Sequence, residues 1–171
     1  MDLTLGLLCG IGLAAACGFR VFVPLLGTSI AAMSGQLQLS PGFEWMGTLP
    51  ALITFGTATA LEIGAYYIPW LDNLLDVVAT PAAAVAGAML TAAMVTDMSP
   101  FLKWTLAVIA GGGVATAVQT GTAALRGAST LTTAGAANPI ISTVELATSI
   151  LMTALAVLLP ILAFVTLVLI I

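Results

Sequence analysis

Long runs of apolar residues leave this chain little choice of fold. Uninterrupted apolar stretches cover about residues 3–19, 49–68, 77–96, 104–125 and 140–171. A helix needs about 20 residues to cross the roughly 30 Å hydrocarbon core of a bilayer, and every stretch but the first is that long. Within lipid, a helix satisfies its own backbone hydrogen bonds. The sequence therefore predicts an all-α, polytopic transmembrane protein of about five spans, folded as a single domain over residues 1–171.

Charged residues are too scarce to cover a soluble globule. They make up 6% of the chain, against about 25% in soluble domains, and the mean hydropathy is +1.21. We therefore expect a multi-pass protein of the cell's inner (plasma) membrane with lipid as its partner. Three basic residues form no patch that could follow a nucleic-acid backbone, so no nucleic acid is expected to bind.

Enzyme chemistry is not expected either. The chain has no histidine, which removes the usual general base at neutral pH and the commonest metal ligand. No residue resembles a nucleophile with its base. We expect no catalytic residues, no resident metal and no cofactor.

Four ionisable residues fall within or next to the apolar stretches: Arg20, Glu62, Arg126 and Glu145. An unpaired charge there costs about 2.5–3.5 kcal/mol on insertion scales, so these side chains should pair, neutralise or face water. One interpretation is two Arg–Glu pairs that fasten the helices together. The other is a substrate-binding polar site near the membrane midplane, where arginines hold an anion or glutamates carry a proton or cation.

A helix-breaking residue follows each arginine. Pro24 lacks an N–H, so the carbonyl of Arg20, four residues earlier, would lose its helical partner; Gly127 follows the second arginine. This pattern predicts discontinuous helices whose ends converge on a site. Segments 21–33 and 127–138 are then either re-entrant half-helices or continuations at the interface, and the Thr/Ser content of 127–138 favours the re-entrant form.

Two parts of the sequence look alike. Residues 3–68 and 104–171 each place a glycine-rich helix before an arginine and a glutamate-bearing helix after it, and the predicted span 77–96 links them. Three predicted spans separate the starts of the two units, which would give them opposite orientations, as in the inverted repeats of many transporters. The alternative is that glycine-rich membrane helices all look somewhat alike.

Small residues recur every four positions in three segments, and such stripes let helices approach closely in lipid. We expect most of them to pack within the protein. The alternative use of a stripe is a seam between two copies of the chain, which predicts a homodimer. The three stripes are Gly6, Gly10, Ala14 and Gly18; Gly56, Ala60 and Gly64; and Gly113, Ala117 and Gly121.

Asp72 and Asp76 follow a turn at Pro69. Being four residues apart, they could share a helix face and bind a hard cation together with loop carbonyls. The interpretation we prefer is a helix amino-terminal cap, which the helix dipole favours.

Three strings carry a resemblance to a known family: residues 16–24 (ACGFRVFVP), 62–76 (EIGAYYIPWLDNLLD) and 138–145 (NPIISTVE). Together they resemble a family of small bacterial multi-pass membrane proteins known as domain of unknown function 4126, and the likeness covers essentially the whole chain. It implies a membrane protein of unassigned activity. In that family an acidic residue often follows the glutamate of the third string, whereas here Leu146 follows Glu145.

Two hypotheses for function follow. The first is a small-solute or ion transporter or channel whose path is lined by the four charged residues named above. The alternative is a non-transporting membrane scaffold or lipid-interacting protein in which the same residues are structural pairs.

Overall fold

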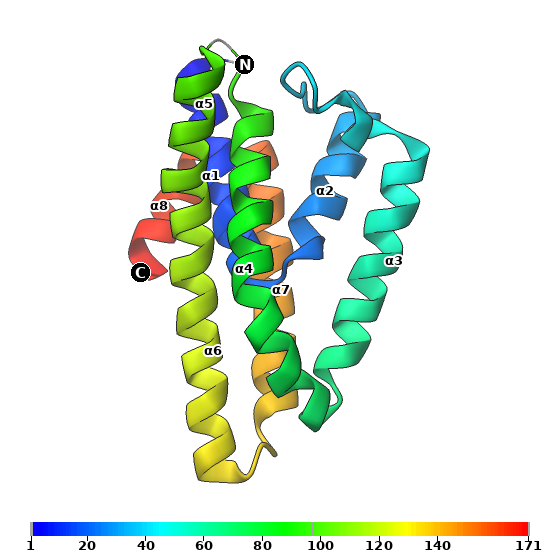
Figure 1. The fold of residues 1–171 in the computed structure, drawn as a ribbon, viewed down its shortest axis with the longest axis vertical. Coiled ribbons are helices and arrows are strands. Elements are labelled where there is room, and N and C mark those ends of the chain that lie inside the picture. Colours follow the sequence, from blue (N-terminus) through cyan, green and yellow to red (C-terminus); the bar gives the residue numbers. More distant parts are fainter. Residues whose placement is uncertain (1, 97, 171) are drawn as a thin grey trace.

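The computed structural model describes residues 2–96 and 98–170, without the side chains of residues 69, 70, 72, 73 and 170. Every regular element in that part of the chain is helical, which confirms the all-α prediction (Figure 1). The elements are α1 (Leu3–Phe19), α2 (Phe22–Met33), the 3-10 turn η1 (Glu44–Gly47), α3 (Leu49–Tyr66), α4 (Pro69–Met94), α5 (Pro100–Leu106), the π-helical η2 (Ala107–Gly112), α6 (Gly113–Thr133), α7 (Asn138–Leu158) and α8 (Pro160–Ile170).

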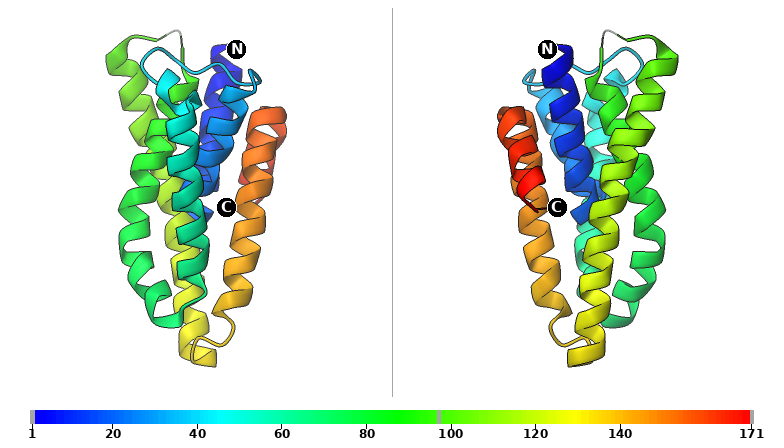
Figure 2. Two further views of the ribbon diagram at one scale, coloured as in Figure 1. Left: turned by 90° about the vertical axis from the view of Figure 1, so that its right-hand side faces the viewer. Right: turned by 90° about the vertical axis from the view of Figure 1, so that its left-hand side faces the viewer.

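The first two helices form a hairpin within the bundle. In Figure 1, α1 descends from the amino-terminal end and α2 returns toward that end, and the turn between them lies about half-way along the long axis. By contrast, α3, α4, α6 and α7 extend into the opposite, lower end. At the other edge, α8 folds back from α7 beside α1, as the two views of Figure 2 show.

The predicted spans are found as helices, with one exception. Three helices of the described chain are long and apolar enough to cross a membrane: Leu74–Met94, Pro100–Thr133 and Asn138–Leu158. The apolar helices Leu3–Phe19, Phe22–Met33 and Pro160–Leu169 have 10–17 residues. The stretch 140–171 is not one span, because one helix ends at Leu158 and another begins at Pro160. Proline has no N–H to donate to the preceding turn.

The two predicted helix breaks have different outcomes. At the first arginine the break is present: Arg20 is extended, with φ −148° and ψ 125°, and Pro24 sits in the first turn of α2, where its missing N–H is not needed. The prediction of a re-entrant half-helix over 127–138 is wrong, because α6 continues through Gly127 to Thr133. A single glycine costs a helix only about 1 kcal/mol, and threonine hydroxyls in this stretch donate back to carbonyls of their own helix.

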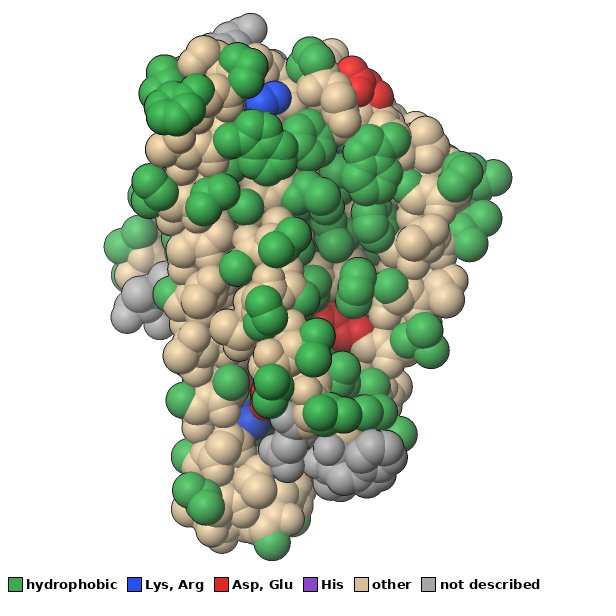
Figure 3. Space-filling model, viewed as in Figure 1, with side chains coloured by type: hydrophobic (Ala, Val, Ile, Leu, Met, Phe, Trp, Pro, Cys, Tyr) green, Lys and Arg blue, Asp and Glu red, His purple; other side chains and the backbone are tan. Residues whose placement is uncertain are grey.

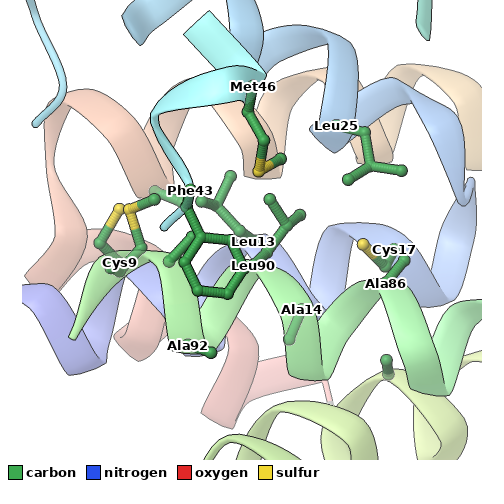
Figure 4. Packing of buried hydrophobic residues seen from close by; sticks show 14 of the residues in the cluster. Cys9, Leu13, Ala14, Cys17, Leu25, Phe43, Met46, Ala86, Leu90 and Ala92 are labelled. Carbon is green, nitrogen blue, oxygen red and sulfur yellow. The ribbon is translucent and has the colours of Figure 1, made fainter. Parts of the chain in front are cut away.

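Helix α1 is the centre of the bundle. Ten of its 17 residues are buried, and it contacts α4, α6, α7 and α8. Its small side chains permit this: a Cβ added at Gly10 would lie 2.8 Å from Cα of Thr91, and one at Gly18 would lie 2.5 Å from Cβ of Val118. The surrounding core includes Cys9 and Leu13 of α1 (Figure 4). The first small-residue stripe therefore packs within the chain, as expected.

The two arginine-bearing helices run in the same direction. Along α1, Gly10 lies beside Thr91 and Gly18 beside Val118 of α6, while Gly111, earlier on the same continuous helix as Val118, also packs on Thr91. An inverted repeat would have made these helices antiparallel. The reason for the difference is the α1–α2 hairpin. Because α2 returns to the end from which α1 starts, these two helices together do not carry the chain to the opposite end of the bundle. The structure gives the inverted arrangement no support.

The outer surface is apolar. Leucine, isoleucine and valine side chains are exposed along most helices; Leu131 is 90% and Leu169 81% exposed, and hydrophobic side chains cover much of the face seen in Figure 3. A soluble monomer rarely exposes apolar patches of this extent. The protein is membrane-embedded.

Candidate functional site

The turn of the α1–α2 hairpin places Arg20 inside the bundle. Its side chain is 2% exposed. Its Nη2 donates to the carbonyl oxygen of Ser142 on α7 at 2.8 Å and lies 3.4 Å from Oε2 of Glu145. The Nε and Nη1 atoms have no hydrogen-bond partner among the described residues. Since a guanidinium has five N–H donors, three of those on Arg20 are unused by the described part of the chain.

The second arginine joins the same cluster. Arg126 of α6 is fully buried, and its Nη1 donates to Oε2 of Glu145 at 3.0 Å. Its Nη2 pairs with Asp76 of α4. One oxygen of Glu145 therefore serves both arginines, and the charges link the hairpin tip, α4, α6 and α7 in one network.

Tyr66, at the end of α3, contacts both guanidinium groups with its ring. Its ring centroid is 3.7 Å from Cζ of Arg20 and 4.6 Å from Cζ of Arg126. A cation over an aromatic face gains about 2 kcal/mol or more when water is excluded. The ring thus stabilises two like charges that would otherwise repel each other.

Glu62 is not held in an Arg–Glu pair. It forms no described ion pair with an arginine; instead, Oε1 accepts from the N–H of Val21 at 2.7 Å and Oε2 from the N–H of Phe22 at 3.1 Å. These donors belong to the first turn of α2, so a carboxylate from α3 occupies the positive end of another helix. Arg20 and Arg126 also attract this carboxylate electrostatically.

The cluster lies in the lower half of the bundle. Arg126 is seven residues from the end of α6 at Thr133, and Glu145 is seven residues from the start of α7 at Asn138, or about 10 Å in each helix. The continuous helix Pro100–Thr133 has 34 residues, about 51 Å, and exceeds the roughly 30 Å hydrocarbon core. Part of it must lie outside that core.

All four predicted site residues come together, but not as two separate pairs. Sequence reasoning missed Tyr66 and the ion pair of Asp76. Tyr66 could have been found, because it lies four residues after Glu62 and so shares its helix face.

The two aspartates do not form the predicted helix cap. Helix α4 begins at Pro69 and its cap position is Ile68, so Asp72 comes three residues after the start. Asp76 pairs with Arg126. The side chain of Asp72 lies outside the described residues, and a cation site shared by the two aspartates stays a prediction. No group of three or more metal-binding side chains occurs in the described part of the chain.

Comparison with known proteins gives one match. The family described as Domain of unknown function (DUF4126) matches residues 7–171, nearly the whole chain. The chain belongs to this family. No curated protein and no solved structure matches it. Membership in DUF4126 therefore agrees with the resemblance of the three strings, and the function has to be argued from the cluster itself.

Proposed function

We propose that the protein moves a small solute or ion across the membrane, as a transporter or channel, and that the charge cluster is the polar site on its path. The observation that carries the proposal is Arg20: a buried guanidinium with three N–H donors unused by the described residues, at the tip of a helical hairpin. Irregular backbone survives at membrane depth where it is buried in protein or lines a watery cavity. Helix ends that meet inside a bundle are the usual ion and substrate sites of transporters.

Two surface grooves lie along α7, one on each side of Glu145 in the helix. A groove of about 340 Å³ lies between α2 and α7 and reaches Ile150 on α7. Another, of about 280 Å³, lies between the lower ends of α6 and α7 and reaches Ile141. Glu145 lies between these two positions on α7.

The competing proposal is a non-transporting scaffold or lipid-interacting protein. It is favoured by the ion pairs of Glu145 and Asp76, which join the hairpin tip to α4, α6 and α7. For such a protein, the cluster would only hold the helices in place.

Flux through proteoliposomes separates the two proposals. The purified protein is tested with a panel of simple anions, cations and pH jumps. The variants Arg20→Gln and Glu62→Gln are compared with Lys103→Gln and Glu44→Gln, which remove the same charges outside the cluster. Lys103 donates to Ser40 at the upper end, and Glu44 is exposed. We expect flux in the wild type and both controls and its loss in the cluster variants. Folded protein that moves nothing in the panel would favour the scaffold.

The proposal extends to location and assembly. We place the protein in the plasma (inner) membrane as a homodimer. Two small-residue stripes support the dimer, because Gly64 of α3 and Gly113 and Gly121 of α6 would accept a Cβ without meeting any atom of the chain within 4 Å. A cysteine at Gly121 should cross-link two copies in native membranes, and failure to cross-link would remove that seam.

A further inference from the structure

A cavity opens from the apolar outer surface between the start of α2, α3 and α4. Its volume is about 390 Å³, within the range of roughly 300–1,000 Å³ that is typical of small-molecule sites. Leu61 of α3 and Val78 of α4 line the cavity and are exposed, so its mouth lies on the face that meets lipid. In Figure 3, an acidic side chain is visible between α4 and α3 among hydrophobic ones. A molecule dissolved in the bilayer can therefore reach this cavity from the side.

Among the described residues that form the wall of the cavity, one carries a charge. The wall consists of aliphatic side chains, the rings of Phe22 and Tyr66, and the carboxylate of Glu62. A carboxylate beside apolar surface is costly unless partners stabilise its charge. Each oxygen of Glu62 accepts one backbone N–H and can accept a second contact.

The balance of charges around the cavity favours a cation. Two arginines and three carboxylates form the cluster in the described part of the chain: Arg20, Arg126, Glu62, Asp76 and Glu145. Glu145 lies against both arginines and Asp76 pairs with Arg126, whereas the described contacts of Glu62 are backbone N–H groups. Both arginines attract Glu62 from a distance, but the other two carboxylates already pair with them. With all five groups ionised, one negative charge is in excess, and Glu62 is the carboxylate without an ion pair.

The ring of Phe22 adds to this preference. Its own N–H donates to Oε2 of Glu62, so the ring and the carboxylate belong to the same wall of the cavity. Aromatic faces attract cations, most strongly where water is excluded. The cavity thus combines an apolar enclosure with a carboxylate and an aromatic ring.

We propose that this cavity binds a lipophilic monovalent cation, with Glu62 as its counter-ion and the aliphatic wall enclosing its apolar substituents. The inference rests on the proposed transport function, for which it names the class of solute. Glu62 stays in place as the partner of the α2 backbone, and the cation takes the positions on the carboxylate that the N–H groups leave open. Such a cation dissolves in the bilayer, which suits a mouth on the lipid-facing surface. A neutral lipid chain in the same cavity would gain nothing from Glu62.

Two ions of the same shape and opposite charge test the site. Tetraphenylphosphonium and tetraphenylborate carry the same phenyl groups and differ in the sign of their charge. Each is titrated separately by equilibrium dialysis into the purified wild-type protein in a non-ionic detergent, with protein-free micelles as the blank. We expect saturable binding of the cation and at least about tenfold weaker binding of the anion, because like and opposite charges differ strongly beside a buried carboxylate. Equal binding of both ions would identify an apolar site for lipid chains, and binding of neither would leave no site; either result overturns the proposal.

Two matched pairs of variants locate the bound cation. Glu62→Gln keeps the shape of the side chain and should weaken cation binding at least about tenfold, whereas Glu44→Gln changes an exposed carboxylate and should bind like the wild type. Ala58→Phe fills the cavity from α3 and should weaken binding as well, whereas Thr57→Phe adds a ring at an exposed position of the same helix and should not. Unchanged binding in Glu62→Gln or in Ala58→Phe would overturn the site. If Glu62→Gln does not fold, the Ala58 pair and the two ions decide by the same criteria.

The outcome does not depend on transport. Binding of tetraphenylphosphonium in detergent together with silent proteoliposomes would leave the cation site standing and remove the transport function. Flux that depends on Arg20, together with no binding of tetraphenylphosphonium, would do the reverse.

Discussion

Replacing Glu145 by glutamine tests whether one shared carboxylate holds the cluster together. Its Oε2 lies 3.0 Å from Nη1 of Arg126 and 3.4 Å from Nη2 of Arg20, and the side chain is 4% exposed. Glutamine keeps the shape and removes the charge, which leaves two buried guanidinium groups facing each other. Breaking a buried ion pair from one side costs about 3–5 kcal/mol. Because Arg126 keeps Asp76, we expect the lower end of this range, about 3 kcal/mol.

Thermal unfolding in detergent measures this loss through the fluorescence of the three tryptophans. A loss of about 3 kcal/mol should lower the midpoint by roughly 6–12 °C for a chain of this size. The matched variant Glu44→Gln changes an exposed carboxylate and should cost about 0.5 kcal/mol or less. A midpoint for Glu145→Gln within about 2 °C of the wild type, the shift of 1 kcal/mol or less, would refute the reasoning.

Three further predictions use the same purified protein. Gly18→Ala should cost about 1–3 kcal/mol, because its Cβ would lie 2.5 Å from a side-chain carbon of α6, whereas the Cβ of Gly127→Ala meets nothing within 4 Å; equal unfolding midpoints would contradict this. Tyr66→Leu should lower the free energy of unfolding by about 2 kcal/mol more than Tyr66→Phe does, since phenylalanine keeps an aromatic face for both guanidinium groups. A lower unfolding midpoint for Tyr66→Phe than for Tyr66→Leu would count against the stacking argument. Cys9 and Cys17 are fully buried, so a maleimide should label them only in unfolded protein, as mass spectrometry would show; rapid labelling of folded protein would disprove the packing of α1.

The membership of the site could be predicted because charges in apolar segments are costly. That cost requires Arg20, Glu62, Arg126 and Glu145 to find partners, and four such residues in one small bundle have few places to do so. The helix break at Arg20 was also predictable, since Pro24 removes a specific hydrogen bond. Both predictions depend on local chemistry that does not require the tertiary fold.

The connectivity within the cluster could not be predicted in the same way. Glu62 faces the start of α2 because α1 and α2 turn back inside the bundle, and a sequence cannot distinguish such a hairpin from a crossing when both are apolar. The extra direction change also explains why α1 and α6 are parallel. Similarly, Gly127 has the composition of a break but not the steric conflict of proline, so the helix continues through it at a cost of only about 1 kcal/mol.

The central position of α1 makes completion of its packing depend on helices that are synthesised after it. The ribosome makes the chain from its amino terminus, so α1, with Arg20 at its end, is made before the helices that cover it. Its buried surface is covered by α4, α6, α7 and finally α8, which are made afterwards. Until α7 is made, Arg20 at the tip of the hairpin lacks its partners Ser142 and Glu145. A chain truncated before α8 would leave one face of α1 uncovered.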